Sequence, residues 1–293
     1  MESQKLTPCL WFNDNAEEAV IFYTSIFKNS KINGVTHYGD AAAEASGRPK
    51  ESLMTLVFEL EAQEFMALNG GPHFNFTPAL SFFVWCETEK EIDDLWRKLS
   101  AGGKALMELD KYPFAEKYGW CEDKFGVSWQ LILSIRKQKI SPALLFVKEQ
   151  SGKAEEAMKF YTSLFKNSKI ESIACDDKTG VVLHARFTLA GQDFVALESP
   201  MEHPCTFTPA ISFIVNCDSQ QEIDEFWKTL SADEEAEQCG WLRDQFGVSW
   251  QIVPSVLGKM MLDIDSKKSE QVMKALLRMK KLDIQILKQA AEK

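Results

Sequence analysis

Two glutamines in identical sequence contexts are the polar residues best placed to do chemistry in this chain. The six-residue phrase FGVSWQ occurs twice, and it ends at Gln130 and at Gln251. If each phrase contains a strand, its side chains alternate, so Gln130 faces a cleft while Trp129 faces the core. A buried amide without a partner costs about 1–3 kcal/mol. Each glutamine is therefore expected to bond a neighbour such as Ser81 or to bind a ligand.

Other residue types that carry chemistry are poorly arranged for it. The seven cysteines form no Cys-x-x-Cys pair, and an odd number in a chain of 293 residues predicts reduced thiols rather than a disulfide framework. The sequence has no glycine-rich turn suited to a nucleotide-derived cofactor, and no Walker, Gly-x-Ser-x-Gly or His-Glu-x-x-His pattern. We assign no catalytic residue and expect no cofactor; whether the protein is an enzyme is left open.

Composition and charge exclude several classes of protein. The formal net charge of −10 repels phosphate backbones, so nucleic acid is not an expected partner. No apolar run approaches the ~18 residues of a membrane span. The first residues lack the apolar core of a signal peptide, which predicts a cytoplasmic protein.

The two glutamines belong to an internal duplication that runs through most of the chain. The phrase TSIFKNSKI, which begins at Thr24, returns as TSLFKNSKI from Thr162, and FTPALSF from Phe76 returns as FTPAISF from Phe207. Agreement this dense predicts two copies of one domain. The spacing between copies changes at 41–47, 104–114 and 150–153, and these places are expected to be surface loops.

Strand and helix signals alternate within each copy. A helix should begin after Asn15 as its N-cap, and the pattern Thr88-x-x-Glu91, repeated as Ser219-x-x-Glu222, should cap a second helix. Alternating apolar residues predict strands in the first copy at 10–12, 53–60, 64–68, 79–85, 121–127 and 128–134.

These elements predict an α+β fold. Each copy matches a pair of βαβββ modules, so the chain holds four modules in a tandem duplication. One module cannot bury both faces of its sheet, and modules should therefore pair into curved sheets that enclose a cleft. We expect domains at 1–136 and 139–255 that form an internal pseudo-dimer, and a C-terminal helical extension at 256–293. Further homo-oligomerisation is left open.

The C-terminal extension is expected to be structural. Its apolar residues recur at helical spacing, and Val272, Leu276 and Met279 should dock on the body of the protein over 266–292. Asp265 or Ser266 should cap its first helix, and Asp283 should begin a second.

Three phrases resemble a known family. They are NAEEAxxFY at 15–23, GWCEDKFGVSWQ at 119–130 and MKKLDI at 279–284. The chain is similar to the PhnB-like group, which is labelled 3-demethylubiquinone-9 3-methyltransferase. That group belongs to the vicinal oxygen chelate superfamily, with glyoxalase I, extradiol dioxygenases and bleomycin-resistance proteins. The resemblance covers nearly the whole chain, twice, and implies the paired βαβββ fold.

The resemblance also allows a test for metal. Metal-using members of the superfamily place His, Gln or Glu on the first and fifth strands and Glu on the last. The matching positions here offer neither His nor a carboxylate; they fall near Pro8 and Pro142, Ser81 and Ser212, and Gln130 and Gln251. Amide oxygens bind transition metals weakly, so no metal is expected. His73 and His203 recur ahead of matching phrases, as surface residues or as a shared site.

The leading hypothesis is a metal-free protein that binds a small molecule in an apolar cleft. The alternatives are a metal-dependent lyase or isomerase of the same superfamily and, less favoured, the methyltransferase of the label. Trp11 and Trp85 correspond to Leu145 and Asn216 in the second copy, so the first copy is the preferred cleft. The expected ligand-binding residues are Gln130, Ser81 and Trp11 in the first copy and Gln251 and Ser212 in the second.

Overall fold

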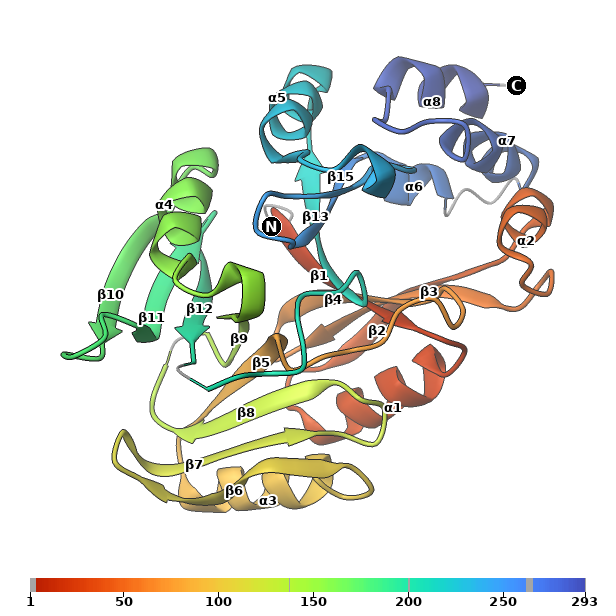
Figure 1. Cartoon of the computed structure of the whole chain (residues 1–293). Coiled ribbons are helices and arrows are strands. Elements are labelled where there is room, and N and C mark those ends of the chain that lie inside the picture. Colours follow the sequence, from red (N-terminus) through yellow and green to blue (C-terminus); the bar gives the residue numbers. More distant parts are fainter. Residues whose placement is uncertain (1–3, 137, 200, 262–265, 293) are drawn as a thin grey trace.

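Two mixed β-sheets form the centre of the protein, and helices cover their outer faces (Figure 1). The computed structural model describes residues 4–136, 138–199, 201–261 and 266–292. No helix among these residues is long and apolar enough to cross a membrane.

The two repeats share a common order of helices and strands, and the first repeat adds α2 and β6. The first has β1 (Leu6–Phe12), α1 (Ala16–Ile26), β2 (Lys31–His37), α2 (Asp40–Ser46), β3 (Leu53–Leu60), β4 (Gln63–Asn69), β5 (Leu80–Cys86), α3 (Glu89–Leu99), β6 (Lys104–Tyr112), β7 (Ala115–Glu122) and β8 (Ser128–Leu133). The second has β9 (Ile140–Phe146), α4 (Ala154–Leu164), β10 (Lys169–Cys175), β11 (Val182–Leu189), β12 (Gln192–Glu198), β13 (Ile211–Cys217), α5 (Gln220–Leu230), β14 (Trp241–Arg243) and β15 (Ser249–Pro254). The C-terminal extension has α6 (Leu257–Met261), α7 (Ser266–Leu276) and α8 (Ile284–Ala291).

Each sheet combines one module from each repeat. Sheet A has the order β14-β15-β13-β1-β4-β3-β2, and sheet B has the order β10-β11-β12-β9-β5-β8-β7-β6. The repeats join where β1 pairs antiparallel with β13, and again where β5 pairs antiparallel with β9. The predicted duplication and module pairing are confirmed, and the pairing runs between the repeats.

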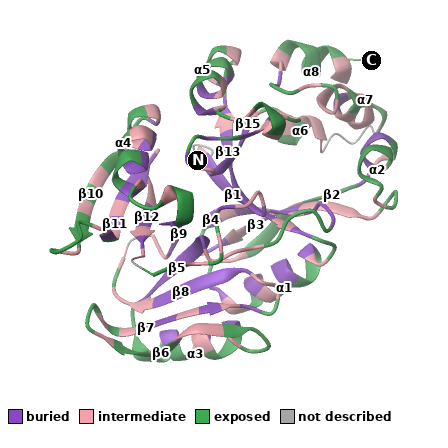
Figure 2. Cartoon of the chain, viewed as in Figure 1, coloured by how far each residue is buried: buried purple, intermediate pink, exposed green. Residues whose placement is uncertain are grey.

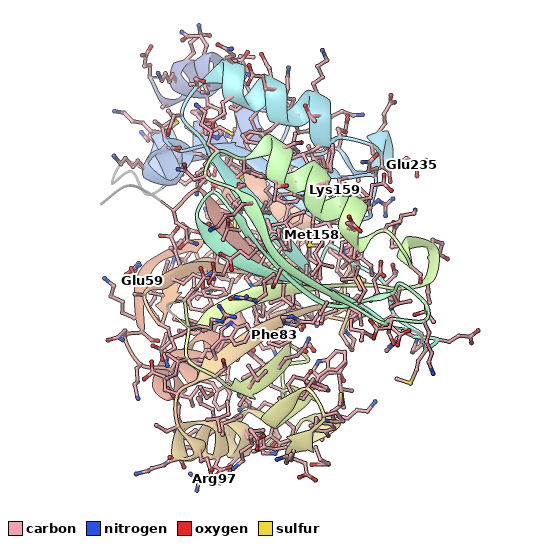
Figure 3. The ribbon with its side chains drawn as sticks, turned by 90° about the vertical axis from the view of Figure 1, so that its left-hand side faces the viewer. Glu59, Phe83, Arg97, Met158, Lys159 and Glu235 are labelled. Atoms are coloured by element: carbon pink, nitrogen blue, oxygen red, sulfur yellow. The ribbon has the colours of Figure 1, made fainter. Side chains whose placement is uncertain are left out.

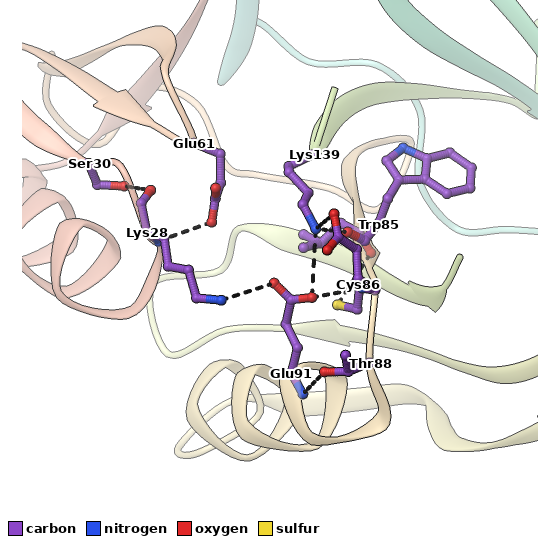
Figure 4. Close-up of polar contacts among 10 residues, drawn as sticks. Lys28, Ser30, Glu61, Trp85, Cys86, Thr88, Glu91 and Lys139 are labelled. Carbon is purple, nitrogen blue, oxygen red and sulfur yellow. Dashed lines mark hydrogen bonds and ion pairs between the residues drawn. The ribbon is translucent and has the colours of Figure 1, made fainter. Parts of the chain in front are cut away.

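Equivalent polar contacts hold both junctions. Lys139, just before β9, forms ion pairs with Glu87 (3.0 Å) and with Glu91 of α3 (3.7 Å) in the other repeat (Figure 4). Lys5, just before β1, forms the matching ion pair with Glu222 of α5. The Thr88 hydroxyl accepts from the backbone N–H group of Glu91, and the Ser219 hydroxyl accepts from that of Glu222, as the capping patterns predict.

Alternation along the strands divides each sheet into two faces. One face packs on the helices: Leu10 and Phe12 of β1 and Trp129 of β8 all lie in the main core. Figure 2 shows this buried centre and the exposed outer surfaces of the helices. We call the opposite surface of each sheet its helix-free face, since it turns away from α1, α3, α4 and α5; on sheet A the C-terminal helices meet the two ends of this face, at Val253 and beside Thr36.

Three local expectations are wrong. Residues 41–47 are not a loop, because the alanine-rich segment forms α2 and ends at Gly47 with φ +69°. Residues 104–114 extend sheet B as β6. The expected strand at 121–127 ends at Glu122, because Asp123 and Gly126 (φ +88°) form a tight turn. The expected N-cap of α1 is correct in position, since Asn15 directly precedes the helix, but the Asn15 side chain makes no capping hydrogen bond; Asn69 Oδ1 accepts from Ala16 N instead.

The C-terminal helices connect the two edges of sheet A. Val272 is fully buried in a cluster that includes Val253 of β15, and Leu276 and Met279 pack against it, as expected. At the other edge of the sheet, Glu270 of α7 accepts from Ala41 N (2.7 Å) at the start of α2. The chain leaves the helix after Leu276, and Asp283 caps α8 as predicted. Asp265 lies outside the described residues, as does the side chain of Ser266.

Candidate functional site

Gln130 lies on the helix-free face of sheet B, and both polar atoms of its side-chain amide are hydrogen-bonded. Its Nε2 donates to Ser81 Oγ (2.8 Å), and its Oε1 accepts from the Tyr118 hydroxyl. Gln130 is only 1 % exposed and Ser81 is fully buried. The structure therefore brings the two predicted residues together, and they form a closed chain of hydrogen bonds with Tyr118.

Gln251 occupies the equivalent position on sheet A. Its Nε2 donates to Ser212 Oγ (3.0 Å), and the Cys9 thiol contacts both side chains. Burial raises the pKa of the Cys9 thiol to about 11, so it remains protonated at neutral pH. Cys9 takes the place of Ala143 on sheet B, and the polar centres of the two sheets therefore differ.

Trp11 does not share a sheet with Gln130. It lies on sheet A, and its ring packs edge-to-face on Trp241 and on Phe74. Its indole Nε1 donates to Gly71 O (2.8 Å). The expected first-copy site of Gln130, Ser81 and Trp11 is therefore wrong as a grouping, because β1 and β5 belong to different sheets.

The helix-free face of sheet B is filled by its own side chains. Phe83, Trp85 and Tyr118 are buried there, with Ala143 and Val195, in one apolar cluster. Figure 3 places Phe83 in the interior of the molecule, whereas Arg97 lies on the outer surface. The Arg136 guanidinium covers the Trp85 ring at 5.2 Å. A ligand would have to displace this cluster to reach Gln130.

The helix-free face of sheet A leaves its apolar side chains partly exposed. Val57, Met66 and Leu68 are each only half-buried, and strand register places Met66 beside both Cys9 and Val57. None of the packed apolar clusters of the described chain includes these three residues. Sheet A therefore offers apolar surface where sheet B has packed aromatic rings.

A cavity of about 320 Å³ lies at the β2 edge of sheet A, beneath α7. Its lining includes Thr36, Tyr38, Met273 and Glu270. The Thr36 hydroxyl contacts Thr55 Oγ1 (2.6 Å), and Thr55 pairs with Leu68. The cavity therefore adjoins the apolar surface, at a distance of several strands from Gln251. Sequence reasoning missed it because it depends on contacts between α7 and the opposite edge of the sheet.

Two buried carboxylates were also missed. Asp123 Oδ1 accepts from Phe125 N and Val127 N, and its Oδ2 accepts from the Tyr23 hydroxyl and Trp129 Nε1. Asp244 makes the same four contacts in the second repeat. An aspartate stands two residues before FGVSWQ in both repeats, and this recurrence could have identified the two residues from the sequence. Their hydrogen bonds indicate a structural role.

Among the described residues, no hydrogen bond, ion pair or ring contact joins His73 to His203. His73 is exposed and lies near Trp11, with ring centroids 6.4 Å apart. His203 is partly buried in the equivalent loop of the other repeat. A third histidine, His184, packs against Phe83 on sheet B, and burial beside Arg186 and Arg136 lowers its pKa to about 4.

The hydrogen-bonded group around Gln251 does not fit a divalent metal. Gln251, Ser212 and Cys9 present an amide, a hydroxyl and a protonated thiol, without a carboxylate or imidazole to offset the metal charge. Within the described ranges, no three His, Cys, Asp or Glu side chains are grouped to hold a metal ion. We therefore derive no chemistry through a metal.

Comparisons with known proteins agree with this architecture. A family model described as 3-demethylubiquinone-9 3-methyltransferase matches residues 4–132 and again 138–253. No curated protein matches. A solved structure titled as a putative 3-demethylubiquinone-9 3-methyltransferase, PhnB protein, from Bacillus cereus is 46% identical, with a TM-score of 0.41; the match covers 45% of this chain and 100% of that one. Glyoxalase I from Zea mays is 13% identical with a TM-score of 0.56, over 89% of this chain and 96% of that one, which shows a shared fold.

Proposed function

Because the chain belongs to the family described as 3-demethylubiquinone-9 3-methyltransferase and has the glyoxalase-like fold, we propose that it binds a small molecule through apolar contacts on the helix-free face of sheet A, without a tightly held metal. One observation supports this site above the other. Sheet A leaves Val57, Met66 and Leu68 only half-buried and outside the packed clusters, whereas sheet B packs Phe83, Trp85 and Tyr118 into a cluster. Exposed apolar surface beside a cavity is typical of ligand sites.

The cavity under α7 supports the same assignment. Its volume of about 320 Å³ lies within the range of small-molecule sites. A ligand that extends from Leu68 past Thr55 would enter it. Gln251 and Ser212 then have a structural role in the sheet, since the two side chains are already hydrogen-bonded to each other.

Methyl transfer is not part of the proposal. Nucleotide-derived cofactors are usually held by a glycine-rich turn in a parallel sheet, and both sheets here are mixed. Binding of S-adenosylmethionine to the purified protein would favour the methyltransferase instead. Stoichiometric zinc, nickel or iron retained after dialysis against a chelator would favour a metal-dependent enzyme.

A matched pair of substitutions tests the site. Leu68 and Leu197 occupy equivalent positions on sheets A and B, and both are half-buried. With the neutral fluorescent probe N-phenyl-1-naphthylamine, we expect Leu68→Trp to weaken binding at least tenfold, because the indole fills the surface. Leu197→Trp should leave the affinity within twofold. Equal effects of the two substitutions, with both variants folded by circular dichroism, would contradict the proposal.

A further inference from the structure

Glu64 is a half-buried carboxylate without an ion pair on the proposed ligand surface. Its Oε1 accepts from the Thr7 hydroxyl at 3.3 Å, and the described residues supply neither an ion pair nor a second side-chain donor. The side chain lies on the same face as Met66, two residues along β4. Burial, with the nearby charge of Glu59, raises the pKa of Glu64 above its ordinary value.

Because the chain is duplicated, the surroundings of Glu64 on sheet A can be compared with the equivalent position on sheet B. Asp193 on β12 is the counterpart of Glu64, and Val195 is the counterpart of Met66. Arg186 pairs in register with Val195, just as Val57 pairs with Met66. Sheet B thus carries an arginine where sheet A carries a valine.

Cations of the protein itself occupy this place on sheet B. Arg186 forms an ion pair with Glu171 (3.3 Å), and Arg136 covers the ring of Trp85. Both arginines line a cavity of only about 10 Å³ together with Glu171 and Asp193. Two guanidinium groups therefore lie on this part of sheet B: that of Arg186 pairs with Glu171, and both line the small cavity beside Asp193.

Sheet A has acidic and apolar groups at this position but no counterparts of the two arginines of sheet B. Val57 replaces Arg186. Arg136 has no counterpart either, because the residue at its matching sequence position in the second repeat is Leu257 of α6. Glu59 has Lys31 as a partner at 3.5 Å, but Glu64 has none among the described residues. Asn216 adds a further polar group, since its Nδ2 donates to Gln4 O and reaches Thr7 Oγ1 at 3.5 Å.

We propose that Glu64, with Thr7 and Asn216 beside it, binds the positively charged end of a small organic cation whose apolar part lies on Met66 and Val57. This inference rests on the proposed function and names its ligand class: an amine or guanidine whose cation would lie on the part of sheet A that corresponds to the Arg186 guanidinium on sheet B. An ammonium group beside a poorly solvated carboxylate forms a charge-assisted hydrogen bond, which is stronger than a neutral one. The adjoining apolar surface favours an amphipathic ligand.

The test compares two probes of equal length by isothermal titration calorimetry. We expect 2-phenylethylammonium to bind at least tenfold more tightly than 2-phenylethanol. Glu64→Gln should bring the affinity for the amine to within twofold of that for the alcohol, because only the charge is lost. Asp193→Asn, the matched change on sheet B, should leave the preference unchanged.

A second variant introduces an arginine on sheet A at the position equivalent to Arg186. Val57→Arg should lower the affinity for the amine at least tenfold, because the new guanidinium would pair with Glu64 across the strands, as Arg186 pairs across the strands with Glu171 on sheet B. Equal binding of amine and alcohol by the unmodified protein would overturn the inference and leave the proposed function standing. Failure of both probes to bind would overturn both. An amine preference that survives Glu64→Gln would show that another residue selects the cation.

Discussion

Asp123 and Asp244 show how a single buried carboxylate positions a whole segment. Each accepts two backbone N–H groups from the turn that follows it and two side-chain donors, a tyrosine hydroxyl and a tryptophan Nε1. The tyrosine comes from the first helix of the same repeat, and the tryptophan from its last strand. The carboxylate therefore ties the two modules of one repeat together, although those modules belong to different sheets.

Replacing either aspartate by asparagine should be costly. In Asp123→Asn, the amide NH₂ would face two donors that lose their acceptor, and an unsatisfied buried polar group costs about 1–3 kcal/mol. We expect the free energy of unfolding to fall by about 2–4 kcal/mol in chemical denaturation. Asp94→Asn, an exposed ion-pair partner of Arg97, should cost less than about 1 kcal/mol. Equal losses for the two variants would show that the network adds little.

Asp244 should also make stability depend on pH. Burial outweighs the four hydrogen bonds and raises its pKa from the ordinary 3.8 to about 6. Between these values the folded state holds a proton that the unfolded state releases, so stability falls as pH rises from about 4 to 6. The loss amounts to about 3 kcal/mol across the window. We expect the difference between the unmodified protein and Asp244→Asn to show this slope; parallel curves would contradict it.

At the scale of elements, local sequence signals predicted most helices and strands but not those in the insertions. The capping patterns at Thr88 and Ser219 are confirmed, because a cap depends on neighbours three residues apart. Residues 41–47 and 104–114 were expected to be loops because the second repeat lacks them. Alanine-rich sequence and alternating apolar residues nevertheless form α2 and β6, which dock on α7 and β7.

The contact between α7 and α2 should contribute measurably to stability. Glu270 accepts from Ala41 N and so acts as an N-cap supplied by a distant helix, since the local cap position is Gly39. Loss of such a cap costs about 1 kcal/mol. We expect Glu270→Ala to lower the free energy of unfolding by that amount and Glu270→Gln, which keeps an acceptor, by less than half of it. The contact contributes nothing if both variants match the unmodified protein.

At the scale of the whole molecule, the sequence predicted the duplication but not which residues meet in each site. The FGVSWQ phrases correctly placed Gln130 with Ser81 and Gln251 with Ser212, because β5–β8 and β13–β15 pair within one repeat. Trp11 was misplaced because β1 pairs with β13 of the other repeat. Strand alternation defines the face that a side chain occupies, whereas the partner strand depends on tertiary packing. The open apolar surface of sheet A is a consequence of that packing.

The interleaved sheets predict the behaviour of a single repeat. A fragment of residues 1–136 lacks β13 and β9, so its β1 and β5 would each expose an unpaired edge. A second copy can supply equivalent strands, and we expect a dimer whose thermal midpoint rises with concentration. The midpoint of the full chain should not change with concentration in the same way. A folded fragment that sediments as a monomer would contradict this account of the sheets.

The most direct test of the ligand site is the position of a bound heavy atom. Crystals soaked with 2-(4-bromophenyl)ethanol would locate the bromine by its anomalous scattering, without any assumption about charge. We predict one dominant peak on the helix-free face of sheet A, beside Met66 and Leu68 or in the adjoining cavity under α7. A dominant peak among Phe83, Trp85 and Tyr118 of sheet B, or none on either face, would contradict the account.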